Sequence, residues 1–427
     1  MRSSLRPPVD REWSRLAGKA SAMTFAAASP NRLVIIPVLG VTQIFAWGSS
    51  YYLPAVLAKP IAADTGWPLT WVVGGLSLGL LMAALISPRV GLAIERHGGR
   101  WVLPLSAAAI GIGQIGLAIA SNLTLYVIAW LIIGVGMGAG LYDAAFATLG
   151  RLYGRDARSA ITALTLFGGF ASTVCWPLSA LLASQLGWRG ACLVYATIQL
   201  AVALPSYLIF VPRVAPARPA RPDAAHAAQA PIAAKPSWIL LTVLAVALTL
   251  AATISSLVSV HLLTILRANG VTLAVAVALG ALVGPAQVAA RTVEMAIARR
   301  HHPIGTKIAS VSFVALGLSA LWAGLPLIPI ALACYGAGIG LESIARGTLP
   351  LALFGATGYA TLMGRLAVPS LLAQAAAPWI GAILLERAGA SGTLAVLASI
   401  ALFNVALTGG LVWLVHRRRA IAPSVPG

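Results

Sequence analysis

The 427-residue sequence has few charged residues and very few acids among them. Asp, Glu, Lys and Arg make up 9% of the chain, and 10 acidic residues stand against 29 basic ones. Soluble globular domains carry a charge on roughly a quarter of their residues. The low charge and the 59% hydrophobic content therefore exclude an ordinary soluble domain and indicate a membrane protein.

The residue types that build disulfides, metal sites and catalytic centres are also scarce. The three cysteines, Cys175, Cys192 and Cys334, lie in apolar runs without a pairing pattern, which indicates neither a disulfide nor a metal site. His301 and His302 are adjacent in a basic loop with no cysteine or carboxylate nearby. No Ser-His-Asp set or carboxylate pair falls at membrane depth. We therefore expect no enzyme activity, no metal and no cofactor.

Two long apolar regions of equal length make up most of the chain. A segment at 212–236 holds six prolines and four basic residues, a composition that stays extended and predicts a cytosolic linker. It separates an N-terminal region at 33–211 from a C-terminal region at 237–415, each 179 residues long, and cytosolic tails are expected at 1–32 and 416–427. Because a helical crossing with its connection takes about 30 residues, each region has room for six crossings.

The sequence therefore predicts an all-α membrane protein made of two six-helix bundles related by a pseudo-two-fold axis. The expected spans are 33–57, 70–88, 101–120, 123–148, 160–184, 190–211, 238–262, 272–296, 308–323, 328–353, 359–385 and 394–415. A shift of 200 residues superimposes the glycines of the fourth span on those of the tenth, which makes the two spans counterparts. These glycines are Gly136, Gly138 and Gly140 in the fourth span and Gly336, Gly338 and Gly340 in the tenth.

The distribution of basic residues predicts the orientation of the chain. With the N-terminus in the cytosol, 22 Lys and Arg residues fall in cytosolic segments and four fall outside. This asymmetry predicts a multi-pass protein of a bacterial cytoplasmic (inner) membrane with both termini in the cytosol, and it makes nucleic-acid binding an unnecessary explanation for the net charge. Three arginines, Arg291, Arg346 and Arg365, remain inside predicted spans.

The loop after the second span carries a recognisable pattern of glycines and charges. Its residues are Gly91, Glu95, Arg96, Gly98 and Arg100. This pattern resembles the signature loop of the major facilitator superfamily, and the resemblance implies alternating access by two bundles about a central site. Glu95 stands where the family usually has Asp. Trp130 stands where many proton-coupled members carry an arginine, and Pro177 follows Trp176 instead of glycine, which disfavours drug/proton antiport.

A branch resemblance adds a substrate class. The run from Tyr142-Asp143 to Arg158, the following LTLFGGFAS, and the charges of the eighth and eleventh spans are similar to the oxalate/formate and monocarboxylate porters. This resemblance implies a small organic anion held by cationic side chains of the C-terminal half, with Arg291 and Arg365 at the corresponding places.

The charges inside the spans can also be weighed without the resemblance. A charge near the bilayer centre costs at least about 2.5–3.5 kcal/mol, so each is a functional candidate. Glu342 and Arg346 lie four residues apart, and Arg291 and Glu294 three apart, so both couples can neutralise locally and leave Arg365 over. We expect Arg291 and Arg365 to clamp a carboxylate, with Gln287 orienting it. The alternative is a structural network at the inner gate.

The remaining candidates have gate, proton-coupling or lining roles. Arg346 is expected at the gate, and Asp143 in a gate relay with Arg96 or Arg100. Glu294 and Glu342 are the proton candidates, because an acid beside an arginine can exchange a proton for substrate. Polar residues expected to line the cavity are Gln43, Trp47, Tyr51, Tyr335 and Gln374. Core packing or helix–helix hydrogen bonding is the alternative for this last group.

The favoured function is secondary active transport of a small organic anion, mono- or dicarboxylate-like, with proton coupling and exchange both open. The alternatives are an efflux pump for drug-like or amphipathic compounds and a transporter-like receptor without turnover. The expected partners are an anionic small molecule, membrane lipids and, for a coupled carrier, protons. The protein is expected to be a monomer.

Overall fold

The computed structural model describes residues 31–213, 238–324 and 327–421. Most of the predicted tails and linker lie outside these ranges. Every regular element in the described part is a helix. The N-terminal half contains α2 (Arg32–Gly48), α3 (Leu53–Thr65), α4 (Leu69–His97), α5 (Gly99–Ile119), α6 (Leu123–Gly140), α7 (Tyr142–Tyr153), η1 (Gly154–Asp156), α8 (Ala157–Gly169), α9 (Ala171–Thr197), η2 (Ile198–Ala203) and α10 (Leu204–Phe210). The C-terminal half contains α11 (Trp238–Ala268), α12 (Leu273–Gly280), α13 (Val283–Ile297), η3 (Ala298–Arg300), α14 (Pro303–Trp322), α15 (Ile328–Phe354) and α16 (Tyr359–Ile421).

Ten stretches of the described residues are long and apolar enough to cross a membrane. Two of them, Ala157–Phe210 and Tyr359–Arg417, are 54 and 59 residues long, more than twice the roughly 20 residues of one crossing. Each contains one non-helical glycine, Gly187 with φ 69° and Gly389 with φ 66°, a conformation that costs glycine little. Both glycines fall where the sequence predicts a connection between two spans.

The ninth predicted span begins too late. The sequence predicts a start at 308, but α14 begins at Pro303, with His302 accepting a hydrogen bond from the backbone N–H of Ile304. The prediction treated Lys307 as a loop charge, whereas its side chain is fully buried within the helix bundle. A rule that ends each predicted span at a charged residue therefore leaves out a lysine that lies inside the helix because a carboxylate neutralises it.

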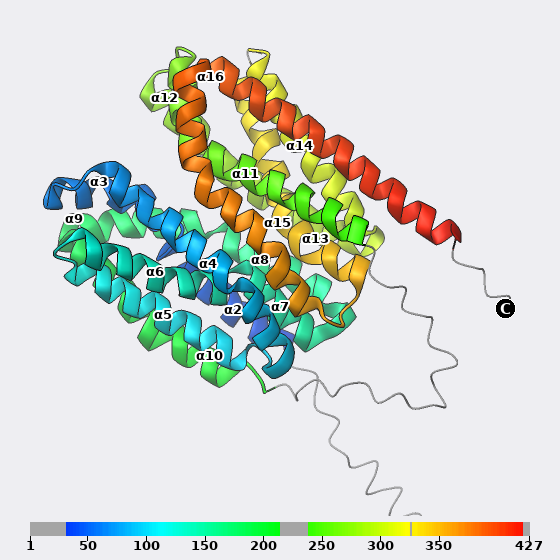
Figure 1. Ribbon diagram of the computed structural model, residues 1–427, viewed down its shortest axis with the longest axis horizontal. Coiled ribbons are helices and arrows are strands. Elements are labelled where there is room, and N and C mark those ends of the chain that lie inside the picture. The colour runs from blue at the N-terminus through cyan, green and yellow to red at the C-terminus, as the bar shows by residue number, and fades with distance from the viewer. Residues whose placement is uncertain (1–30, 214–237, 325–326, 422–427) are drawn as a thin grey trace, which may run out of the picture.

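The two halves lie side by side and contact each other most closely at one end (Figure 1). There α8 packs on α13 and α15, α7 packs on α16, and α4 packs on α16. The connections at 97–99, 154–156, 298–302 and 355–358 gather at this end. We call it the basic end because Arg96, Arg100, Arg151 and Arg158 lie at or beside these connections. At the opposite end α3 packs on α4 and α9 of its own half, and α12 on α11 and α15 of its own.

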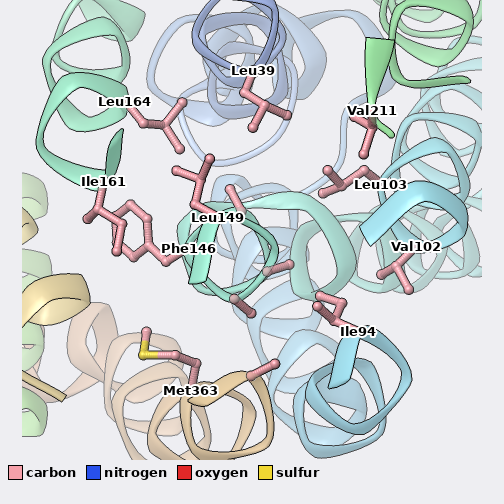
Figure 2. Packing of buried hydrophobic residues seen from close by; sticks show 14 of the residues in the cluster. Leu39, Ile94, Val102, Leu103, Phe146, Leu149, Ile161, Leu164, Val211 and Met363 are labelled. Carbon is pink, nitrogen blue, oxygen red and sulfur yellow. The ribbon is translucent and has the colours of Figure 1, made fainter. Parts of the chain in front are cut away.

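An apolar core crosses the boundary between the halves at the basic end. Leu39, Ile94, Phe146 and Leu149 of the N-terminal half pack in one buried cluster with Met363 of α16 (Figure 2). Leu351, Tyr359 and Ala360 extend this cluster within the C-terminal half. Burial of these side chains stabilises the contact between the halves, but the hydrophobic effect has no directional preference. The orientation of the two halves therefore depends on the polar groups around the cluster.

The internal repeat is present, but its register differs by two residues from the predicted one. The Ser106 hydroxyl donates to the Gly136 carbonyl at 2.8 Å, and the Ser310 hydroxyl donates to the Gly338 carbonyl at 2.9 Å. Gly138 packs on Ala83 of α4, and Gly340 packs on Gln287 of α13. The glycine run of α6 therefore matches that of α15 at a shift of 202, not 200. The sequence alone cannot distinguish the two shifts, because the glycines are spaced two residues apart and either shift superimposes glycine on glycine.

The crossing of α4 and α16 gives a first prediction. A Cβ on Gly364 would overlap the Ser87 carbonyl and lie 3.1 Å from the Gly91 Cα, so Gly364→Ala forces the two backbones apart. Overpacking of this kind costs about 1–3 kcal/mol. We expect a lower thermal unfolding temperature of the detergent-purified protein. The matched control is Gly284→Ala, since nothing lies within 4 Å of the added carbon. Equal unfolding temperatures for the two variants would contradict the crossing.

Candidate functional site

Arg291 is a buried cation at the boundary between the halves. It lies on α13, is 4% exposed, and donates from Nη1 to the Thr165 carbonyl of α8 in the other half at 2.9 Å. Its Nε donates to the Gly340 carbonyl and its Nη2 to the Gln287 Oε1, both at 3.2 Å. All these acceptors are neutral, and in the described part of the chain no carboxylate forms an ion pair with Arg291. Three of the five guanidinium N–H groups are thus hydrogen-bonded, and no negative charge compensates the cation.

Aromatic side chains lie around this cation. Trp47 contacts Tyr51 with ring centroids 5.3 Å apart and Tyr142 at 5.0 Å. The Tyr142 hydroxyl lies 3.5 Å from the Thr165 carbonyl that also accepts from Arg291. The Tyr52 ring lies 6.0 Å from the Trp47 ring between centroids. The indole N–H of Trp47 is buried and has no hydrogen-bond partner among the described residues. This is a donor that a bound ligand could satisfy.

The other predicted lining residues hold helices together. Gln43 donates to the Gly140 carbonyl at 2.5 Å and fixes α2 on α6. The Tyr51 ring packs against the Trp47 ring of the same half, edge to face. Tyr335 is buried in the core of the C-terminal half, and Gln374 donates to the Ser370 carbonyl at 3.1 Å. Of the predicted lining set, Trp47 and Tyr51 lie beside the boundary near Arg291.

Arg365 does not lie with Arg291. It is exposed on the face of α16 that also carries Leu372 and Trp379, which are 45% and 71% exposed. Gly364, about 100° around the helix from Arg365, packs on α4, and the opposite face packs on α11 through Gln374. The predicted two-arginine clamp is therefore wrong in its geometry, because spacing along the chain could not tell which face of the helix Arg365 occupies.

The predicted local ion pairs are also wrong. Arg346 does not pair with Glu342 but with Asp143 of α7, through Nε to Oδ1 and Nη2 to Oδ2, both at 2.8 Å. The predicted relay from Asp143 to Arg96 or Arg100 is replaced by this pair, since Arg96 is exposed and Arg100 donates to the Val211 carbonyl at 2.8 Å. The bidentate Asp143–Arg346 pair joins the two halves directly.

The signature loop joins the halves by a second contact. Glu95 accepts hydrogen bonds from the backbone N–H groups of Gly358 at 3.3 Å and Ala360 at 3.1 Å, at the start of α16. A carboxylate at a helix N-terminus satisfies free N–H groups and interacts favourably with the helix dipole. Gly91 allows the close approach, because a Cβ there would meet the Ala360 carbonyl at 2.5 Å. Gly98 takes φ 76° between α4 and α5.

Glu294 forms a third contact between the halves. It lies 3.8 Å from Arg158 of α8, accepts from Thr306 at 2.7 Å, and its Oε2 is 3.3 Å from the His301 ring. Arg158 also donates to the His301 carbonyl at 2.6 Å. Sequence reasoning assigned Arg158 and His301 to solvated loops and paired Glu294 with Arg291. Only the folded chain brings these three side chains together.

Glu342 lies in a separate network inside the C-terminal half. Its Oε1 is 2.5 Å from the Lys307 ammonium and its Oε2 accepts from Ser310 at 2.7 Å. Lys307 is fully buried and also donates to the Ala247 carbonyl, as does Asn404. Sequence reasoning missed Lys307 because it was counted among the loop charges. Among the described residues, no group of three or more His, Cys, Asp or Glu side chains could hold a metal ion.

The Asp143–Arg346 pair gives a second prediction. Removing one partner, in Asp143→Asn or Arg346→Gln, leaves a half-buried charge alone and costs about 3–5 kcal/mol, so the basic end should open. We expect faster maleimide labelling of a cysteine introduced at Thr165, which is buried at this boundary, with the native cysteines replaced by alanine. The exchange variant, Asp143→Arg with Arg346→Asp, should restore slow labelling. Unchanged labelling in both single variants would show that this pair does not close the basic end.

The Lys307–Glu342 pair gives a third prediction. Lys307→Met and Glu342→Gln each leave an uncompensated buried charge and should lower the unfolding temperature strongly, whereas the double variant should recover much of the loss. Thermal unfolding of the purified proteins measures this coupling. Lys59→Met, which removes an exposed lysine, is the control. Additive losses in the double variant would contradict the pairing.

Comparison with known proteins agrees with this architecture. The family described as Major Facilitator Superfamily matches residues 38–300. The human organic anion transporter MFSD10 (TETRAN) has a similar solved structure, with 18% identity, a TM-score of 0.66, and coverage of 89% of this chain and 99% of that one. The proton:xylose symporter XylE, bound to 6-bromo-6-deoxy-D-glucose, gives 12% identity, a TM-score of 0.66, and coverage of 90% and 96%. FucP in the outward conformation gives 14%, 0.64, and coverage of 88% and 99%.

One curated relative aligns over part of its length. The transcription regulatory protein OpdE of Pseudomonas aeruginosa is 32% identical over 155 residues, which are 35% of this chain and 38% of the relative. The aligned region thus spans about two fifths of that protein. The solved structures lie below 25% identity and show the fold alone, whereas the family match covers more than half of the chain. The chain is a multi-pass membrane protein, not an enzyme, and it belongs to the major facilitator superfamily of secondary transporters.

Proposed function

We propose that the protein transports a small organic anion by alternating access, and that Arg291 binds the anionic group. The observation that carries this proposal is the uncompensated guanidinium at the boundary between the halves, which contacts Thr165, Gly340 and Gln287 but no carboxylate in the described ranges. A buried charge without a counter-charge is costly, and an anionic ligand supplies the missing charge.

The surroundings of Arg291 support a monoanion with an apolar or planar body. One uncompensated guanidinium matches one negative charge, and a carboxylate can take two parallel hydrogen bonds from it. Gln287 is in contact with Arg291 and would orient it, as the sequence suggests. The rings of Trp47 and Tyr142 offer apolar contact area, and the free Trp47 N–H offers one more donor.

The charge distribution supports a cytosolic position for the basic end. In this orientation both termini face the cytosol, and the kinked stretches Ala157–Phe210 and Tyr359–Arg417 each cross twice, which brings the ten candidate stretches to twelve crossings. The closed basic end then corresponds to a state that faces outward. Transport requires the Asp143–Arg346 pair and the Glu95 contact to break and re-form.

Glu294 is the better candidate for proton coupling of the two acids. It contacts Arg158 of the opposite half and His301, so opening of the basic end changes its surroundings. Glu342 instead pairs with Lys307 within one half. We infer that Glu294 takes part in the gate and that Glu342 stabilises the C-terminal bundle.

A receptor without turnover is the second candidate. The relative that aligns over part of its length is named a transcription regulatory protein, and this favours a receptor. A receptor would bind the anion at Arg291 and change state without net flux. Binding and flux therefore have to be measured separately.

The fourth prediction tests the role of Arg291. In a thermal-shift screen of mono- and dicarboxylates, amino acids and cationic drugs, an anion should stabilise the purified protein, since a ligand that binds the native state raises its stability. Arg291→Gln should abolish this shift and lower uptake of the same anion into proteoliposomes at least tenfold, while Arg291→Lys keeps part of both. Arg267→Gln, which removes an exposed arginine elsewhere, should behave as wild type.

Each outcome has a distinct meaning. Stabilisation by an anion without uptake identifies the receptor. Stabilisation by cationic drugs and none by anions overturns the anion proposal. Wild-type uptake by a correctly inserted Arg291→Gln protein removes Arg291 from the binding site.

A further inference from the structure

We propose, on the basis of the anion-binding role assigned to Arg291 above, that the substrate is an aromatic monocarboxylate whose ring packs against Trp47 and Tyr142. Its carboxylate faces the cation of the C-terminal half, and its ring faces aromatic side chains of the N-terminal half. The interrupted helices near Arg291, the backbone between Arg291 and Tyr142, and the rings beyond Tyr142 all support this class of substrate.

Three membrane-spanning stretches of the N-terminal half are each interrupted between two helices. The interruptions lie at 49–52 between α2 and α3, at Leu141 between α6 and α7, and at Phe170 between α8 and α9. Trp47 stands two residues before the first interruption, and Tyr142 directly follows the second. Interrupted helices typically form the substrate site of secondary transporters. Both rings therefore stand where a substrate is expected.

Arg291 and Tyr142 meet at one end of α8. The Thr165 carbonyl accepts a hydrogen bond from Nη1 of Arg291 at 2.9 Å, and the Tyr142 hydroxyl lies 3.5 Å from the same oxygen. The next turn of α8 carries two consecutive glycines. A Cβ on Gly168 would overlap the Tyr142 hydroxyl, and a Cβ on Gly169 would overlap Nη1 of Arg291. The phenol and the guanidinium therefore lie against the same few residues of backbone.

A connected set of rings continues from Tyr142 within the N-terminal half. Tyr142 stacks on Phe146 with ring centroids 5.0 Å apart and an interplanar angle of 11°. On its other side it contacts Trp47, also at 5.0 Å, and Trp47 contacts Tyr51 at 5.3 Å. Tyr52 lies 6.0 Å from Trp47. These separations are those of attractive aromatic pairs. The rings thus form one aromatic surface that begins beside the cation.

The position of Trp47 is that of a binding surface and not of a packed core. Trp47 and Tyr142 are half-buried, whereas the core residue Trp130 is 1% exposed. The helix that carries Trp47, α2, packs on α6, α8, α9 and α10 of its own half. The Trp47 indole N–H has no hydrogen-bond partner in the described ranges. A buried donor without a partner is costly, which favours a site that a polar ligand completes.

Such a surface distinguishes an aromatic ring from an aliphatic ring of the same size. An aromatic ring has a negative face and a positive edge, so it gains attraction against Trp47 and Tyr142 beyond the burial of apolar area. A cyclohexane ring offers apolar area without this charge pattern. The single guanidinium of Arg291 compensates one carboxylate, and a second carboxylate would stay buried without a counter-charge.

The test compares benzoate with cyclohexanecarboxylate, which have the same charge and the same number of carbon atoms. Dissociation constants are measured by thermal-shift titration of the detergent-purified, full-length protein. We expect wild type to bind benzoate about threefold more tightly or better, as one added aromatic pair would give. This comparison does not depend on the folding of any variant.

Substitutions of Trp47 locate the preference. Trp47→Leu should abolish the preference for benzoate while cyclohexanecarboxylate still binds, because Arg291 is unchanged. Trp47→Phe keeps a ring and should retain most of the preference. Trp101→Leu removes a ring of α5 that is 61% exposed, and this matched control should bind both anions as wild type does. The unfolding temperature without ligand checks that each variant is folded.

The outcomes separate this proposal from the proposed function. Binding of other carboxylates or of cyclohexanecarboxylate, with no preference for benzoate, leaves anion binding at Arg291 in place and overturns the aromatic class. Equal loss of the preference in Trp101→Leu and Trp47→Leu, or complete loss in Trp47→Phe, also overturns it. If no carboxylate of any class stabilises wild type, the proposed function itself fails.

Discussion

Closure of the two halves depends on charged groups that each meet a partner from the opposite half. Asp143 meets Arg346, Glu294 meets Arg158, Glu95 meets the start of α16, and Arg291 meets the Thr165 carbonyl. Removing such groups from water costs nearly as much as their attraction returns. Because the desolvation cost and the attraction nearly cancel, the contact is stable while both partners are in place. It can separate when water solvates the charged groups again. A contact made only of the apolar cluster around Phe146 and Met363 would not have this property.

The charges of the C-terminal half stand where the N-terminal half has small or apolar residues. In the register set by Ser106 and Ser310, Glu342 of α15 occupies the place of Gly140 in α6. The contacts of Gly138 with Ala83 and of Gly340 with Gln287 likewise place Arg291 of α13 where α4 has Ser87. The repeated scaffold is therefore symmetric in packing and asymmetric in charge. The N-terminal half provides the aromatic surface, and the C-terminal half provides the cation.

The fold could be predicted from the sequence because it depends on the length and apolar composition of successive segments. Apolar length predicted an all-helical membrane protein, and the motif from Gly91 to Arg100 indicated the family. The pairing of side chains could not be read in this way. Local spacing favoured Glu342 for Arg346, yet the partner is Asp143, 203 residues away. Spacing also could not give the outward rotation of Arg365, because one residue more or less turns a helix face by about 100°. The buried position of Lys307 could not be predicted either, because charged residues were assigned to the loops between spans.

The position of Lys307 has a consequence for how the chain enters the membrane. α14 carries a full positive charge within its second turn, and the only carboxylate that pairs with it among the described residues is on α15, the next helix of the chain. A helix with an unpaired lysine partitions poorly into hydrocarbon, whereas the two helices together are neutral at this point. Insertion of α14 and α15 together as one hairpin is thus favoured over insertion one after the other.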